Sequence, residues 1–198
     1  MARIIAVASG KGGVGKTTVV ANLAAALAHY NKSVIAVDSN LTTSNLGIHL
    51  GMHLYPKTFH DVLEGKAKIH EAVYYHKSGF KVIPGDISIR KLKNVDSYSL
   101  IDVFYKMLEG TDFILIDTAA GLGKEALAAI EAADELLIVT NPEIPAVTDA
   151  LKLSTIANKL GTRNIGVIVN RVTGKPHELS LDHIENFLNI PVIGYIPE

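Results

Sequence analysis

The stretch Ser9–Thr18 reads SGKGGVGKTT and follows an apolar run over Arg3–Ala8. It satisfies the pattern G-x-x-x-x-G-K-[ST] of a phosphate-binding loop, whose fixed positions fall on Gly10, Gly15, Lys16 and Thr17. Glycines let backbone N–H groups converge on phosphate oxygens, and a helix that follows directs the positive end of its dipole toward the same anion. The sequence therefore predicts a strand, a phosphate loop and a helix in succession.

The loop also predicts which residues hold a nucleotide and its metal ion. The residues expected to contact ATP here are Gly10, Gly12, Gly13, Val14, Gly15, Lys16, Thr17 and Thr18. Lys16 brings a compact positive charge to the outer phosphates and counts as a catalytic residue, while the Thr17 hydroxyl is a ligand for Mg²⁺. The expected cofactors are therefore ATP and Mg²⁺.

Outward from the loop, strand-like and helix-like segments alternate. The expected strands are Arg3–Ala8, Ser33–Val37, Lys81–Ile83, Asp112–Ile116, Glu135–Thr140, Asn164–Val169 and Pro191–Tyr195. The expected helices are Lys16–His29, Ser97–Leu108, Lys124–Ala132, Ala146–Leu160 and Leu179–Phe187. Most strands are continuous apolar runs, as in a sheet covered on both faces. This order predicts an α/β fold with a doubly wound, mostly parallel sheet of the phosphate-loop NTPase type.

Length, charge and composition limit the number of domains, the kinds of metal site and the location that we expect. The chain has 198 residues, which suits a single nucleotide-binding domain over 1–198, and its formal net charge is −1. It contains no cysteine, which excludes disulfides, thiolate metal sites and iron–sulfur clusters held by this chain. No apolar stretch approaches the roughly 20 residues of a membrane span, and no secretory signal is visible. The expected location is the cytoplasm.

Two apolar runs end in an acid. Val34–Val37 is followed by Asp38, and Phe113–Ile116 is followed by Asp117. A carboxylate at such a strand end can hold a water molecule of the Mg²⁺ shell, as in a Walker B motif. We expect Asp117 to do this, and the predicted metal-side residues are Thr17, Asp38 and Asp117.

Lys11 extends the motif in a specific way. The run Gly10–Thr18 closely resembles the deviant Walker A loop of the MinD/ParA ATPases, and the resemblance, most of all to MinD-like members, runs over nearly the whole chain. It implies a slow ATPase whose two chains sandwich two ATP molecules. Each chain would donate Lys11, a catalytic residue, to the nucleotide of its partner. It also implies a switch in cell-division site positioning or related spatial organisation, and a regulatory protein partner.

The resemblance assigns further residues. Gly121 lies in the loop that, in this family, responds to the γ-phosphate and changes shape on hydrolysis. In the same loop, Ala119 replaces the usual proline. Asn170, Arg171 and Pro197 would contact the nucleotide base. Glu143, in the segment Asn141–Glu143, would contact the nucleotide bound by the partner chain. Asp149 stands where the family often has an acid that meets the signature lysine. Asn45 is a candidate for either a nucleotide contact or a helix cap.

Asn40 departs from the family at the catalytic position. Asp38 and Asn40 align with an Asp-x-Asp motif, whose second carboxylate sits by the water that attacks the γ-phosphate. Loss of a true general base would cost roughly 10²–10⁴ in rate. Small GTPases, however, place their water with an amide, so Asn40 is expected to accept one hydrogen bond from water and to support slow hydrolysis.

Two alternative functions remain open at this stage. Asn40 is compatible with a near-inactive, ATP-sensing binding module. A ParA-like DNA-partitioning ATPase would need a basic surface, which the net charge of −1 does not indicate, so nucleic acid is not expected as a partner. Family members continue beyond Glu198, so the C-terminal end is expected to be naturally short or truncated. Membrane association is expected only through a segment absent from this chain, with a peripheral location in a full-length form.

Overall fold

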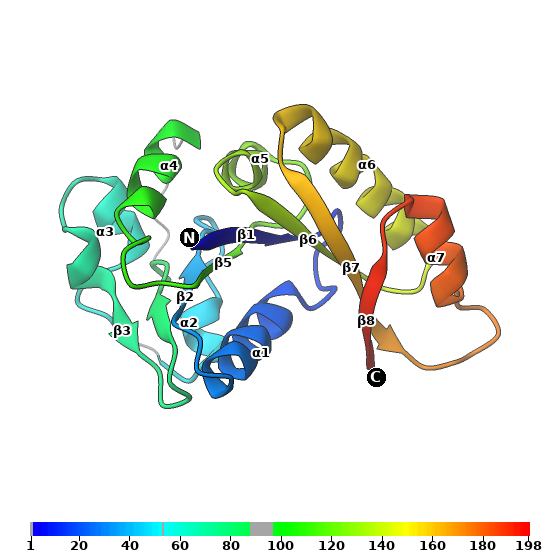
Figure 1. Cartoon of the computed structure of the whole chain (residues 1–198), viewed down its shortest axis with the longest axis horizontal. Coiled ribbons are helices and arrows are strands. Elements are labelled where there is room, and N and C mark those ends of the chain that lie inside the picture. Colours follow the sequence, from blue (N-terminus) through cyan, green and yellow to red (C-terminus); the bar gives the residue numbers. More distant parts are fainter. Residues whose placement is uncertain (1, 53, 88–96) are drawn as a thin grey trace.

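The protein is an α/β sandwich built on one eight-stranded sheet (Figure 1), seen in a computed structural model that describes residues 2–52, 54–87 and 97–198. The strands are β1 Arg3–Ala8, β2 Val34–Asp38, β3 Tyr74–Tyr75, β4 Lys81–Ile83, β5 Phe113–Asp117, β6 Glu135–Thr140, β7 Arg163–Val172 and β8 Val192–Pro197. Their order in the sheet is β3-β4-β2-β5-β1-β6-β7-β8. All neighbouring pairs are parallel except β3 and β4, which confirms the predicted fold class.

Helices cover both faces of the sheet. They are α1 Lys16–His29, α2 Leu46–His49, α3 Phe59–Leu63, α4 Ser97–Tyr105, α5 Lys124–Glu131, α6 Ile144–Leu160 and α7 Leu181–Leu188, with a short 3₁₀ helix at Ile69–Ala72. Figure 1 shows α1 and α2 on one side of the sheet and α5 and α6 on the other. Burial on both sides explains why the central strands read as continuous apolar runs instead of alternating ones.

The packing divides into two hydrophobic clusters, one on each face. The helices α3 to α7 contribute to the first cluster, for example through Phe59, Phe104 and Ile184. The helices α1 and α2 contribute to the second, through Val20, Ala24 and Leu46 among others. The strands supply alternate residues to each cluster, so one sheet organises the whole core.

The register of the central strands places Asp38 and Asp117 side by side at one edge of the sheet. In β2 and β5, Asp38 lies opposite Asp117, and in β1 and β5, Val7 lies opposite the same Asp117. The loop over residues 9–15 follows β1 at the same edge of the sheet. The carboxyl edge of a parallel sheet is where ligands bind in open α/β folds, because the loops there diverge.

The predicted elements differ from the observed ones mainly at their ends. The helix α6 begins at Ile144 because Pro145 is tolerated in its first turn, and α4 ends at Tyr105. The strand β7 reaches Val172, three residues past the expected end. The short elements α2, α3 and β3 were not predicted. A helix of about one turn, or a strand of two residues, is too short for its hydrophobic periodicity to be detected.

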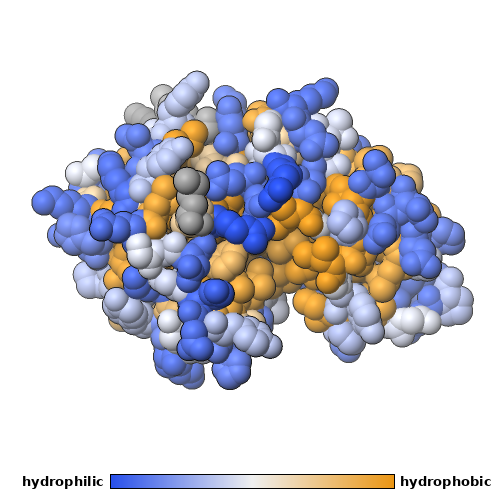
Figure 2. All heavy atoms as spheres, viewed as in Figure 1, coloured by the Kyte–Doolittle hydropathy of each residue, from blue (hydrophilic) through white to orange (hydrophobic). Residues whose placement is uncertain are grey.

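The strand β8 lies at one edge of the sheet and leaves Ile193, Tyr195 and Ile196 exposed. Figure 2 shows hydrophobic surface on this side of the molecule. None of the helices in the described part of the chain has the length and hydrophobicity that a transbilayer segment requires.

Candidate nucleotide site

The phosphate loop is held in shape by glycine conformations and by an asparagine from β7. Gly13 and Gly15 have φ values of 76° and 102°, a region that suits glycine. Asn170 donates a hydrogen bond from Nδ2 to the carbonyl oxygen of Val14 at 2.7 Å. A Cβ on Gly15 would lie only 2.2 Å from that Nδ2 atom. Asn170, predicted as a base contact, therefore supports the loop backbone.

The other end of the loop rests on α6. A Cβ on Gly10 would lie 2.5 Å from backbone atoms of Asp149, so only glycine lets the loop pack this closely. Behind the loop, the Lys16 ammonium donates to the Ser9 hydroxyl at 3.0 Å and is largely buried. Burial lowers the pKa of Lys16, and the negative charge of Asp117 acts in the opposite direction. Ser9 was not among the predicted site residues.

Thr17 and Asp117, both predicted as metal-side residues, are joined by a hydrogen bond. The Thr17 hydroxyl donates to Oδ2 of Asp117 at 2.7 Å. The other carboxylate oxygen, Oδ1, is buried and finds no hydrogen-bond partner among the described residues. Burial raises the pKa of Asp117 to about 6, against the hydrogen bond from Thr17 and the charge of Lys16. A hydroxyl beside an unpartnered buried carboxylate oxygen suits a hard cation such as Mg²⁺.

Asp38 occupies a different environment from the one predicted. Its side chain is fully buried; Oδ1 accepts from the Asn40 N–H at 3.2 Å and Oδ2 from the Leu46 N–H at 3.0 Å. Burial raises the pKa of Asp38 to about 8, with a further contribution from Asp117, while backbone hydrogen bonds oppose the rise. Both oxygens are thus engaged by the chain itself. The arrangement favours an anchor for the loop after β2 over the metal ligand that we expected.

Around the loop lies a cavity of about 390 Å³. Its lining residues are Gly12, Gly13, Gly15, Lys16, Thr17, Thr18, Asn40, Thr43, Asn45, Thr118, Ala120 and Arg171. The structure thus brings most of the predicted phosphate contacts together with Asn40 and Arg171. Asn45 lines the cavity and makes no helix-cap hydrogen bond; its Nδ2 donates to the Thr43 carbonyl at 2.8 Å.

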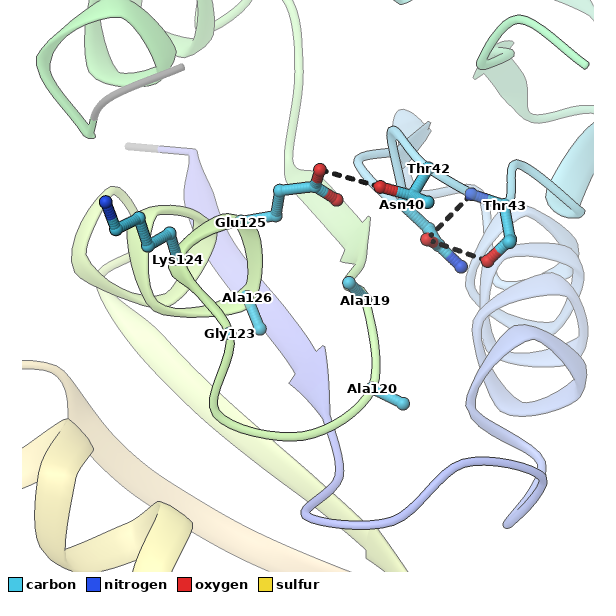
Figure 3. A pocket seen from close by; sticks show the side chains of 9 residues that line it. All are labelled: Asn40, Thr42, Thr43, Ala119, Ala120, Gly123, Lys124, Glu125 and Ala126. Atoms are coloured by element: carbon cyan, nitrogen blue, oxygen red, sulfur yellow. Dashed lines mark hydrogen bonds between the residues drawn. The ribbon is translucent and has the colours of Figure 1, made fainter. Parts of the chain in front are cut away.

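The Asn40 amide is already in use. Its Oδ1 accepts from the Thr43 N–H at 3.3 Å and from the Thr43 hydroxyl at 3.1 Å (Figure 3). An amide oxygen has two lone pairs, so little capacity remains to accept a hydrogen bond from water. The expectation that Asn40 accepts from the attacking water is therefore not supported by this geometry. Thr43 was missed from the sequence, although its position three residues after an asparagine is a pattern of local capping.

Lys11 pairs within its own chain. Its ammonium lies 3.1 Å from Oε1 of Glu143, and both side chains are about half exposed, at 46% and 48%. Asp149, the expected partner of the signature lysine, instead lies 3.0 Å from Lys152. Lys11 and Glu143, predicted to reach the nucleotide of a partner chain, thus lie together at the surface.

The remaining predicted residues surround the site. The Gly121 N–H donates to the Ser9 carbonyl at 2.9 Å, which ties the loop after β5 to the phosphate loop. Arg171 has a φ of 59° and lies 3.7 Å from Glu198, and Pro197 lies opposite Val172 in the β7–β8 register. Pro197 is exposed and does not line the 390 Å³ cavity.

The chain is similar to known ATP-binding proteins. A family model described as an AAA domain matches residues 2–166. An uncharacterized ATP-binding protein of Methanocaldococcus jannaschii is 46% identical over 198 residues, which cover 100% of this chain and 75% of that protein.

Two solved structures show the same fold. The septum site-determining protein MinD from Pyrococcus horikoshii, in complex with Mg-ADP, is 38% identical with a TM-score of 0.94; the match covers 100% of this chain and 82% of that one. MinD in a MinC:MinD cell division complex from Aquifex aeolicus is 33% identical with a TM-score of 0.88, over 100% and 82% of the two chains.

Proposed function

The chain belongs to the MinD/ParA family of ATPases as a MinD-like member, and we propose that it is a Mg-ATP-dependent dimerisation switch. In this proposal ATP closes a dimer, a regulatory protein partner binds the closed form, and slow hydrolysis releases it. The role would be positioning of the cell-division site or related spatial organisation, since the Pyrococcus relative is a septum site-determining protein.

The observation that carries the proposal is the oxygen pair beside the phosphate loop. Thr17 and Asp117 lie 100 positions apart in sequence and meet at 2.7 Å, next to the cavity that Lys16 lines. When bound, Mg²⁺ would neutralise phosphate charge, and the Thr17 hydroxyl and the carboxylate of Asp117 would hold it. The Pyrococcus relative was solved with Mg-ADP, which supports the binding of a magnesium nucleotide by this chain.

The Lys11–Glu143 pair supports the dimerisation step. Both side chains are half exposed, so the ion pair contributes little, on the order of 0–1 kcal/mol, and opens at small cost. A lysine released from Glu143 can turn to the phosphates of a second chain. The proposal of a separate regulatory protein partner follows the Aquifex relative, whose MinD was solved in a complex with MinC.

The state of Asn40 favours slow turnover. With its Oδ1 occupied by Thr43, this residue offers the cavity an amide NH₂, which donates to a phosphate oxygen but does not accept from water. The same observation supports the second candidate function, an ATP-sensing module that binds and dimerises with little hydrolysis.

Calorimetric titration with Mg-ATP tests nucleotide binding. We expect one ATP per chain, and we expect Lys16→Ala to weaken binding by about 10- to 150-fold, because a charged hydrogen bond contributes about 1.5–3 kcal/mol. The matched control is Lys159→Ala, an exposed lysine at the end of α6. Absence of binding by the parent chain, or equal binding by Lys16→Ala, would refute the proposal.

A further inference from the structure

A second cavity of about 460 Å³ adjoins the phosphate cavity. Asn40, Thr43 and Ala120 line both of them. Figure 3 shows Asn40 and Thr43 on one side and the segment from Ala119 to Ala126 on the other, with the Glu125 side chain reaching across toward Thr42. The two cavities therefore meet beside Asn40, and water in the second cavity lies next to the phosphate cavity.

Glu125 is the single carboxylate among the described residues that line this second cavity. It stands in the first turn of α5, where the helix dipole favours a negative charge. Its Oε1 accepts from the Thr42 hydroxyl at 2.8 Å, and within the described part of the chain Oε2 has no hydrogen-bond partner. Glu125 thus presents a free acceptor to the cavity, whereas Asn40 does not.

The small side chains between the two cavities keep the route open. Ala119 and Ala120 line the second cavity below Asn40 and Glu125 in the view of Figure 3, each side chain is a single methyl group, and Ala120 also lines the phosphate cavity. A Cβ placed on Gly123 would meet nothing within 4 Å, so the turn before α5 leaves space for water as well. A carboxylate on α5 can therefore share a water molecule with the phosphate cavity.

We propose that Glu125 supplies the carboxylate that Asn40 lacks, as a catalytic residue that accepts a hydrogen bond from the attacking water. The inference rests on the proposed ATPase function. The water oxygen forms a bond to the γ-phosphorus, while the bond from that phosphorus to the bridging oxygen breaks and leaves its electron pair on ADP. One water proton passes to the Glu125 carboxylate and from there to solvent, and the second stays on the phosphate product.

Steady-state hydrolysis and ATP binding by five chains test this assignment: the parent, Glu125→Gln, Asn40→Asp, the double variant and the control Glu131→Gln. Loss of a general base costs about 10²–10⁴ in rate. We expect Glu125→Gln to lower turnover of the parent at least tenfold, with the ATP dissociation constant unchanged within about twofold. In the Asn40→Asp background the same change should lower turnover less than threefold, because the carboxylate introduced at position 40 then takes over the water. Glu131 lies exposed at the far end of α5, so its variant should match the parent.

A purely structural role gives a different pattern. If Glu125 acted only by holding Thr42, then Thr42→Val, which removes the same hydrogen bond and keeps the carboxylate, would lower turnover as much as Glu125→Gln. We expect less than threefold for Thr42→Val. Equal losses in the two variants, equal effects of Glu125→Gln in both backgrounds, or an unchanged rate would each overturn the assignment.

The failure of this inference and that of the proposed function are separable. A parent chain that hydrolyses ATP and loses nothing in Glu125→Gln refutes only the role of Glu125. A parent chain that binds Mg-ATP without turnover also refutes it and leaves the ATP-sensing module. A parent chain that binds no Mg-ATP refutes both.

Discussion

At the residue scale, Gly15 of the phosphate loop and Gly123 before α5 differ in how much room a side chain would have. Gly15 combines a φ of 102° with an approach of Asn170 that leaves no room for a Cβ. Gly123, which precedes α5, has a φ of −68° and open space where a Cβ would lie. The motif identifies Gly15 from sequence, but Asn170 lies far along the chain, on β7, and only the fold reveals their contact.

Gly15→Ala should therefore be far more harmful than Gly123→Ala. A left-handed conformation costs a non-glycine residue about 1–3 kcal/mol, and the overlap with Asn170 adds to this. We expect a free energy of unfolding lower by at least that amount and a loss of ATP affinity, measured by denaturant unfolding and calorimetry. Equal effects of the two substitutions would show that neither the φ angle nor the contact matters.

Asn40 stands where the family resemblance predicts a second acid, and its effect on the hydrolysis rate can be measured directly. Asn40→Asp restores a carboxylate beside the phosphate cavity, and a positioned base contributes roughly 10²–10⁴. Because Glu125 already supplies part of this function in our proposal, we expect a gain of about tenfold or more in steady-state hydrolysis. Rates that agree within twofold would mean that a carboxylate at position 40 adds nothing here.

At the element scale, one carboxylate links the first residues of three parallel strands. Glu135, at the start of β6, accepts hydrogen bonds from Arg3 at the start of β1, at 2.6 and 2.8 Å, and from Arg163 at the start of β7. Burial alone would raise the pKa of Glu135, but the hydrogen bonds and charges of the two arginines together lower it. The apolar runs predicted these strands, whereas the acid at the start of β6 carried no recognisable signal.

This link predicts a stability that depends on pH. A pKa lower in the folded than in the unfolded state gives stability that is present above the unfolded pKa of about 4.3 and lost as the pH falls through the folded pKa. At pH 7, the free energy of unfolding of Glu135→Gln should be about 1–3 kcal/mol lower than that of the parent. The difference should shrink below about pH 4.

Denaturant unfolding from pH 7 to pH 3 checks this, with the exposed Glu109→Gln as the control. A difference between parent and Glu135→Gln that stayed constant over this range would contradict an ionised Glu135 as its source.

At the scale of the whole molecule, the sequence predicts the sheet and the phosphate loop well, because each is marked by a pattern within a short segment of the chain. Continuous apolar runs mark strands buried on two faces, and the glycine pattern marks the phosphate loop. The contacts that complete the site are long-range. Thr17 meets Asp117 across 100 positions and Lys11 meets Glu143 across 132. The hydrogen bond from Thr42 to Glu125 likewise depends on β2 and β5 being neighbours.

The placement of Asp38 shows the limit of motif reasoning. An acid at a strand end reads as a metal ligand in one dimension. In the fold its oxygens accept from the Asn40 and Leu46 N–H groups, because the loop over residues 39–45 brings the start of α2 back to the end of β2. These backbone contacts depend on local turn geometry, which no spacing rule encodes, and they favour the anchoring role; the metal role of Asp38 stays a prediction.

The central claim is that ATP closes a dimer through Lys11. The most direct test is light scattering of the parent chain with saturating Mg-ATP and with Mg-ADP, beside Lys11→Ala and the control Lys159→Ala. We predict a doubling of mass with Mg-ATP for the parent and the control, none with Mg-ADP, and a monomer in both nucleotides for Lys11→Ala, which should still bind ATP. A parent chain that stays monomeric while saturated with Mg-ATP, or a Lys11→Ala chain that dimerises equally well, would contradict the account.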